Sequence, residues 1–149
     1  MPVVDASVAI DWVAPGVDPS LPSIAVLDRP ADQGDDQGDD LIAPRLFAEE
    51  VANALLTGIR RGRWSGTAAD EGWALFRRLP VRFIDDERDL ERAWDLARRY
   101  DAHPVYGMLY VALAERRRTQ LITADEALRR RLRGLDWIVS PEAFVAGRR

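Results

Sequence analysis

Three acidic residues in well-separated parts of the chain could together hold a divalent cation. Asp5 and Asp125 each follow a short apolar segment, at residues 3–4 and 121–123, that has the character of a buried strand. Glu50 lies inside a helical pattern, next to its apolar row. Because sites in parallel α/β sheets form beyond the carboxyl ends of the strands, we expect these three acids to converge there.

The composition limits the chemistry of such a site to oxygen ligands. The chain has no cysteine and one histidine, His103, which excludes thiolate and multi-histidine metal sites. All 21 basic residues are arginine, so mechanisms that need a lysine are excluded as well. Converging carboxylates suit Mg²⁺ or Mn²⁺, and the matching reaction is hydrolysis of a phosphodiester by a metal-activated water.

Each acid also has a simple structural explanation. Asp5 and Ser7 could cap the helix that follows them, and residues 123–126 fit a capping box, with Thr and Glu three residues apart. In the helical pattern at residues 45–61, the apolar periodicity does not show whether Glu49 or Glu50 faces inward. Asn53 lies one turn further along the same ridge, where it could support the site.

Short apolar strands alternate with helical patterns along the whole chain. We expect strands at residues 2–5, 41–44, 81–85, 120–123 and 137–139, and helices at 6–13, 21–29, 45–61, 67–79, 89–100, 104–117, 126–132 and 141–146. This alternation predicts an α/β fold with a central parallel sheet covered on both faces. No linker divides residues 1–149, so we expect a single domain.

The charges are unevenly distributed. The net charge is −4, but residues 1–75 have a balance of −8 and residues 76–149 a balance of +4. Five of the acids lie in residues 32–40, which have no apolar anchor and which we expect to form a mobile acidic loop. The acidic total therefore does not argue against a polyanionic partner.

Arginines cluster on both sides of Asp125. Arg116, Arg117, Arg129 and Arg130 could bind phosphate groups, or they could simply form solvated helix faces. No apolar stretch of about 18 residues is present, so we expect no membrane span. The N-terminus lacks a basic region and an apolar signal core, which favours a cytoplasmic location.

Four sequence motifs, in order, resemble the PIN-domain ribonucleases and specifically the VapC toxins of type II toxin–antitoxin systems. The motifs are Val3-Val4-Asp5-Ala6-Ser7-Val8-Ala9, the segment from Ala43-Pro44 to Glu50-Val51-Ala52-Asn53-Ala54-Leu55, Tyr106 to Glu115, and Leu121-Ile122-Thr123-Ala124-Asp125. They cover nearly the whole chain. Each motif is weak by itself, whereas four in the same order are specific.

The resemblance implies a three-layer α/β/α fold and cleavage of RNA at an acidic Mg²⁺ (or Mn²⁺) site. It selects Glu50 over Glu49 and makes Asp5, Glu50 and Asp125 the metal-binding and catalytic residues, with Thr123 and Ser7 in support. It also implies a homodimer and inhibition by a cognate VapB-type antitoxin.

One position departs from the family pattern. The resemblance leads us to expect an aspartate directly after Tyr106, where this chain has Gly107. A glycine inside a helix costs about 1 kcal/mol relative to alanine, and an acid near a helix N-terminus is favoured by the helix dipole. Gly107 is therefore either a close-packing position or a lost metal ligand, and we favour the lost ligand.

The sequence thus predicts a VapC-like, Mg²⁺-dependent endoribonuclease whose activity is weak or absent because of Gly107. One alternative is a catalytically dead PIN module that binds RNA or an antitoxin without cutting. A second is a phosphoacceptor domain of the receiver type, which also carries acids at strand ends. The absence of lysine makes the receiver alternative the weaker of the two.

Overall fold

A five-stranded parallel sheet forms the centre of the molecule in the computed structural model, which describes residues 1–28 and 41–148. The acidic loop expected at residues 32–40 lies outside the described residues. The strands are β1 (Val3–Val4), β2 (Leu41–Pro44), β3 (Val81–Ile84), β4 (Leu121–Ile122) and β5 (Ile138–Val139), in the spatial order β3-β2-β1-β4-β5. The expected parallel α/β sheet is confirmed.

The strand order places a switch point in the middle of the sheet. From β1 the chain continues to β2 on one side, and β4 later pairs with β1 on the other side, with Val3 opposite both Ile42 and Leu121. These three central strands consist of apolar residues that are essentially inaccessible to solvent. The carboxyl ends of β1 and β4 therefore lie side by side, which is where parallel α/β sheets form their sites.

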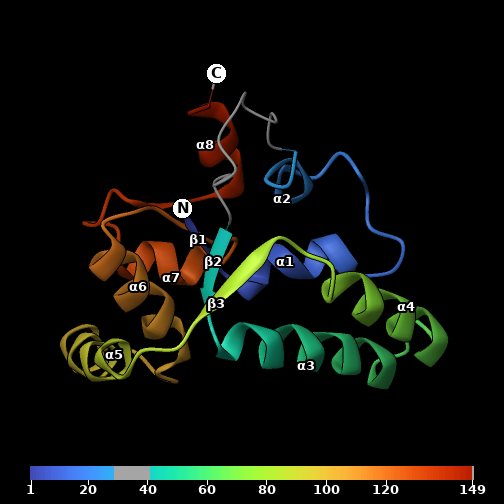
Figure 1. The fold of residues 1–149 in the computed structure, drawn as a ribbon, viewed down its shortest axis with the longest axis horizontal. Helices are drawn as coiled ribbons and strands as arrows, with labels where there is room; N and C mark the ends of the chain where they lie inside the picture. Colours follow the sequence, from blue (N-terminus) through green and yellow to red (C-terminus); the bar gives the residue numbers. More distant parts are fainter. Residues whose placement is uncertain (29–40, 149) are drawn as a thin grey trace.

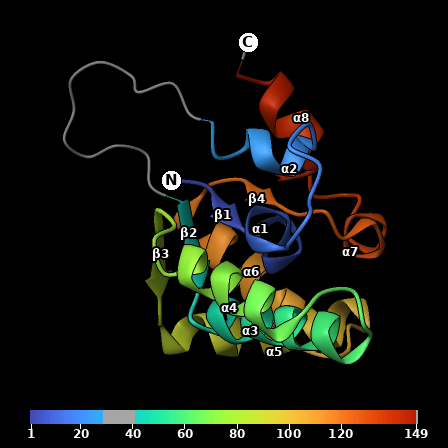
Figure 2. The same cartoon turned by 90° about the vertical axis from the view of Figure 1, so that its right-hand side faces the viewer.

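Helices cover both faces of the sheet and make three layers (Figure 1). They are α1 (Ala6–Val13), α2 (Pro22–Ala25), α3 (Leu46–Arg60), α4 (Gly66–Phe76), α5 (Glu87–Tyr100), α6 (Tyr106–Arg117), α7 (Glu126–Arg131) and α8 (Pro141–Ala146). Helices α1, α3 and α4 pack together on one face, while α6 packs on β1, β2 and β4 and is covered by α5. Figure 2 shows α2 and α8 together at one end of the molecule, where they are in contact.

Four helices differ from their expected boundaries by two residues or more, and one of them is α5, which begins at Glu87 rather than at residue 89. The helix expected at 21–29 is confined to Pro22–Ala25, because the next backbone bonds, from Leu27 N–H to Ile24 and from Asp28 N–H to Ala25, tighten into three-residue turns. The fourth helix ends at Phe76 rather than at residue 79. The helix expected from Pro104 begins two residues later, at Tyr106.

Helix α6 is nearly enclosed, as its apolar sequence predicts. Its residues from Tyr110 to Ala114 are at most 1% exposed. No helix among the described residues is long and apolar enough to cross a membrane.

Candidate active site

Asp5 occupies the carboxyl end of β1 and is held there by two hydroxyl groups. Its Oδ2 accepts hydrogen bonds from Ser7 Oγ at 2.8 Å and from Thr123 Oγ1 at 2.6 Å. Asp5 is only 7% exposed and Thr123 is fully buried. Asp5 stands at the N-cap position of α1, but its side chain makes no capping hydrogen bond. The capping explanation therefore does not account for this carboxylate.

The two hydroxyls also join the ends of β1 and β4. Ser7 Oγ accepts from the backbone N–H of Ala124 at 3.0 Å and lies 3.3 Å from Thr123 Oγ1. Thr123 Oγ1 accepts in turn from the backbone N–H of Asp125 at 3.1 Å. Ser7 and Thr123 were both expected in supporting roles, and the structure places both beside Asp5.

Asp125 behaves differently from Asp5. Its side chain is exposed and caps α7, where Oδ1 accepts from the backbone N–H of Leu128 at 3.0 Å. The capping explanation is therefore correct at this position, although the cap is Asp125 and not Thr123. A carboxylate in this position still acts electrostatically on Asp5, because the two negative charges repel.

Glu50 is the inward-facing acid of α3. Its Oε1 accepts a hydrogen bond of 2.9 Å from the hydroxyl of Tyr110, whereas Glu49 is exposed to solvent. Tyr110 was not expected at the site. A tyrosine on an otherwise apolar buried helix was the available signal, because a buried hydroxyl normally has a hydrogen-bond partner. Asn53 is exposed, and its backbone carbonyl oxygen accepts a hydrogen bond from the Thr57 hydroxyl.

The electrostatics of the paired acids favour a cation. Burial raises the pKa of Asp5, although the Thr123 and Ser7 hydroxyls counteract this effect, and repulsion from Asp125 raises it further. Burial likewise raises the pKa of Glu50 to about 7, with the Tyr110 hydrogen bond opposing and Asp5 adding to the rise. Neither carboxylate forms an ion pair with any residue that the structure describes.

The donor set fits a hard divalent cation incompletely. Buried Asp5 and half-buried Glu50 offer carboxylate oxygens, which are the ligands that Mg²⁺ and Mn²⁺ prefer. Within residues 1–28 and 41–148, however, no three acidic or histidine side chains lie close enough to hold one ion together. Asp125 caps α7 with Oδ1, so its Oδ2 is the oxygen that could serve as a third ligand.

Gly107 is not required by packing. It has no positive φ, and a Cβ added to it would meet only Leu128 Cδ1, at 3.6 Å. By contrast, a Cβ at Gly72 would lie 2.4 Å from the carbonyl oxygen of Val13. The close-packing explanation of Gly107 therefore fails. The residue lies one turn before Tyr110 on α6 and faces Leu128 of α7, so a longer side chain there would extend towards the helix that Asp125 caps.

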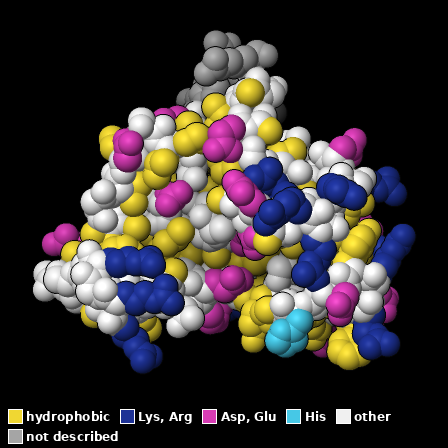
Figure 3. Space-filling model, turned by 180° about the vertical axis from the view of Figure 1, so that it is seen from behind, with side chains coloured by type: hydrophobic (Ala, Val, Ile, Leu, Met, Phe, Trp, Pro, Cys, Tyr) yellow, Lys and Arg dark blue, Asp and Glu magenta, His cyan; other side chains and the backbone are white. Residues whose placement is uncertain are grey.

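Arginines near the site are not all available to a polyanion. Arg116 is bound by both oxygens of buried Asp89, at 2.6 and 2.8 Å, and ties α6 to α5. Arg129 is partly buried, whereas Arg117 and Arg130 are exposed. Figure 3 shows the basic side chains of one face as separate clusters with acidic side chains between them.

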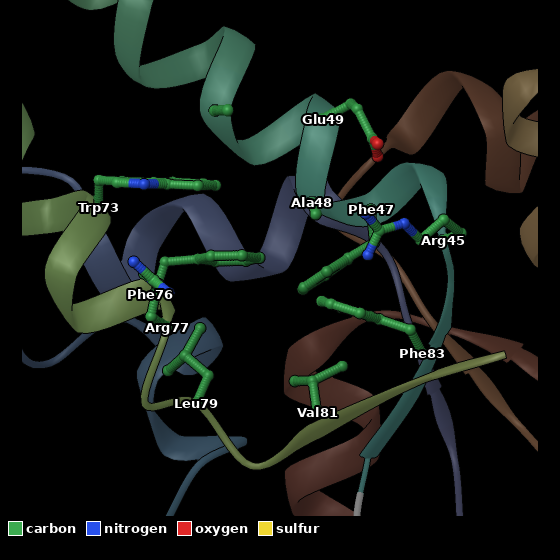
Figure 4. Close-up of a pocket in the computed structure, with 11 residues that line it drawn as sticks. Arg45, Phe47, Ala48, Glu49, Trp73, Phe76, Arg77, Leu79, Val81 and Phe83 are labelled. Atoms are coloured by element: carbon green, nitrogen blue, oxygen red, sulfur yellow. The ribbon is translucent and has the colours of Figure 1, made fainter.

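A second feature, an aromatic groove of about 600 Å³, lies on the other side of the first turns of α3. Figure 4 shows Phe47 from α3, Trp73 and Phe76 from α4, and Phe83 from β3 around it. Phe76 stacks on Trp73 with ring centroids 5.0 Å apart and lies 6.4 Å from Phe83. Arg45 lies over the Phe83 ring, with its guanidinium carbon 5.7 Å from the ring centroid.

Comparison with known proteins assigns the family. A sequence model of the PIN domain matches residues 3–132, which include β1, β2, α3, α6 and β4 and so every acid discussed above. No curated protein is similar enough in sequence to be matched. PIN domains generally have metal-dependent nuclease activity, which agrees with Asp5 at the carboxyl end of β1 and Glu50 on the helix that follows β2. Since the match spans most of the sequence and the sheet has the expected parallel architecture, this chain belongs to the PIN-domain family.

Proposed function

We propose that this protein is a VapC-like toxin, a Mg²⁺-dependent endoribonuclease whose activity is weakened by Gly107. The observation that supports this most directly is the arrangement of buried Asp5 and half-buried Glu50, whose negative charges repel each other and which form no ion pair with a described residue. A divalent cation would relieve this repulsion. When bound, such an ion supplies an activated water and neutralises charge on the phosphate.

The residues of the chain have distinct tasks in this proposal. Asp5 and Glu50 provide the permanent oxygen ligands. Ser7 and Thr123 fix the orientation of Asp5 through their hydroxyl groups. Asp125 would contribute its second carboxylate oxygen, Oδ2, while Oδ1 caps the first turn of α7.

Gly107 is the position where the proposal is most easily tested. An aspartate there would fit, because its Cβ has only a van der Waals neighbour, and it would be favoured near the N-terminus of α6. We therefore expect Gly107→Asp to increase Mg²⁺-dependent cleavage of RNA above that of the unchanged protein. Gly107→Ala is the matched control, because it fills the same space without adding a ligand.

The assay compares the three proteins on one labelled single-stranded RNA, with Mg²⁺ and with EDTA. The proposal requires cleavage by Gly107→Asp that exceeds that of Gly107→Ala, disappears with EDTA and is lost when Asp5→Asn is added. Equal rates for the aspartate and alanine variants would contradict the role given to position 107.

A PIN module that binds without cutting is the alternative function. It is favoured by one observation, that no three acids among the described residues lie close enough to share an ion. RNA binding by the unchanged protein, measured across a Mg²⁺ titration with no cleavage at any concentration, would support it. Exposed Arg117 and Arg130 are the arginines we assign to RNA in either case, and Arg117→Ala should weaken binding more at low salt than at high salt.

We propose the aromatic groove as the docking site of a cognate VapB-type antitoxin. Trp73 and Phe83 remain 38% and 37% exposed there, and Arg45 and Arg77 stand at its rim. An apolar segment with acidic flanks is complementary to this surface. Strand β3, which pairs only with β2 among the described strands, leaves an open sheet edge beside the groove.

The antitoxin proposal is tested with the protein encoded by the neighbouring gene. Phe83→Asp should weaken its binding strongly, as measured by isothermal titration calorimetry. Leu75→Asp is the matched control, since Leu75 is 52% exposed on α4 but does not line the groove. Equal losses in both variants would refute this location.

The homodimer is proposed on a different surface. Leu90 and Trp94 lie one turn apart on α5 and are 56% and 64% exposed, an unusual exposure for side chains of this size. Trp94→Glu should shift the protein to monomer in sedimentation velocity runs. A monomeric parent protein would contradict the proposal.

A further inference from the structure

Tyr110 is the largest side chain that the fold encloses completely. It is 1% exposed and sits on α6 among apolar neighbours, so its hydroxyl is a polar atom in an apolar layer. A buried hydroxyl is costly unless it is hydrogen-bonded. Its partner is the Glu50 carboxylate, 2.9 Å away on α3, which is 60 residues earlier in the chain.

Each acid of the site accepts hydrogen bonds from a different kind of donor. Asp5 is short and accepts from two hydroxyls, and Asp125 accepts from a backbone N–H of α7. Glu50 has a longer side chain with more rotatable bonds, and the Tyr110 hydroxyl is the one hydrogen-bond donor that the described residues offer it. Without this bond the Glu50 carboxylate would be free to turn away from Asp5.

We propose that Tyr110 is a positioning residue that orients the Glu50 carboxylate for metal binding. This inference rests on the proposed function, because it gives Glu50 a metal to bind. The hydroxyl occupies Oε1 of Glu50 and restrains the carboxylate, which would leave Oε2 available to bind an ion. Partners that orient a metal ligand in this way typically contribute 10–100-fold, roughly, to metal affinity.

Tyr110→Phe removes the hydroxyl and keeps the ring that fills the core. We expect Mn²⁺ to bind the variant about tenfold or more weakly than the parent in isothermal titration calorimetry. Tyr100→Phe is the matched control, because Tyr100 is half-buried and no side-chain hydrogen bond of its hydroxyl occurs among the described residues. Mn²⁺ should bind this control as it binds the parent.

A second measurement needs no variant, in case Tyr110→Phe does not fold. In the parent protein labelled with ¹³C at Tyr Cζ and Glu Cδ, the Tyr110 and Glu50 resonances should shift together at the same Mg²⁺ concentration. The resonance of Tyr100 should stay in place. A Tyr110 resonance that does not respond while that of Glu50 does would overturn the positioning role.

The remaining outcomes separate the two proposals. If the parent binds Mn²⁺ and Tyr110→Phe binds it equally well, the positioning role is wrong and the proposed function stands. If the parent binds no Mn²⁺ and shows no Mg²⁺-dependent shift, the proposed function fails and the positioning role fails with it.

Discussion

Replacing Glu50 with glutamine should stabilise the protein at alkaline pH, although it removes a proposed ligand. The folded protein raises the pKa of this carboxyl from 4.5 to about 7, chiefly through burial. An acid whose folded-state pKa lies above its unfolded value destabilises the fold once the pH rises through that interval. The penalty is therefore small near pH 4.5 and complete above about pH 7.

The magnitude follows from the two pKa values. Their difference sets an upper limit of about 3 kcal/mol. Because Glu50 is only half-buried, solvent screening lowers this figure, and we expect about 1–2 kcal/mol. For a chain of this length that corresponds to a rise in Tm of about 3–6 °C. Glutamine keeps the acceptor for the Tyr110 hydroxyl, so this hydrogen bond is not lost.

The assay is thermal unfolding at pH 4.5 and pH 8, with EDTA present and ionic strength held constant. Glu50→Gln should unfold at a higher temperature than the parent at pH 8 and at nearly the same temperature at pH 4.5. Glu49→Gln removes the same charge from an exposed neighbour and should change little at either pH. In a second series at pH 8 without EDTA, Mn²⁺ should stabilise the parent and not Glu50→Gln. A Glu50→Gln variant that is no more stable than the parent at pH 8 would refute the burial argument.

Four further substitutions have expected effects on stability. Gly107→Ala should raise the free energy of unfolding by about 0.5–1 kcal/mol, because alanine has a higher helix propensity than glycine and its methyl group meets no clash. Gly72→Ala should lower the free energy of unfolding by about 1–3 kcal/mol, because the added methyl group overpacks the core. Urea unfolding of both variants checks the two signs. Arg116→Met leaves buried Asp89 without its bidentate partner and should cost about 3 kcal/mol, measured in the same way. Thr123→Val removes the hydroxyl that donates to the buried Asp5 carboxylate and should lower the free energy of unfolding by about 1–3 kcal/mol at pH 8. The loss should be smaller at low pH, where Asp5 is protonated. An equal loss at both pH values would contradict the role given to this hydrogen bond.

The periodic parts of the fold were predictable from the sequence. Strands such as Val3–Val4 and Leu121–Ile122 and helices such as α3 and α5 appear where their apolar patterns place them, with small differences at the ends. These patterns show which face of a helix or strand is buried, and this can be recognised within each segment without knowing the rest of the fold. The shortening of α2 was not predictable, because the tighter backbone turns that end it, at Leu27 and Asp28, leave no signal in the residue types.

The candidate site was predictable in its residue types but not in its arrangement. Capping and ligation use the same residues at the same strand ends, so the sequence left both explanations open for Asp5 and for Asp125. The structure separates them: Asp5 accepts from hydroxyls across the ends of β1 and β4, and Asp125 caps α7.

By itself the sequence determined the ligand chemistry and the fold class. A chain with no cysteine, no lysine and one histidine has only carboxylates to offer a metal, and alternating apolar strands and helices require a covered parallel sheet. The family resemblance already favoured Glu50 over Glu49, but only the tertiary structure showed that Tyr110 holds Glu50 and that Gly107 has room for a side chain. These are contacts between residues far apart in the chain, and they depend on how the helices pack across the sheet, which no local pattern encodes.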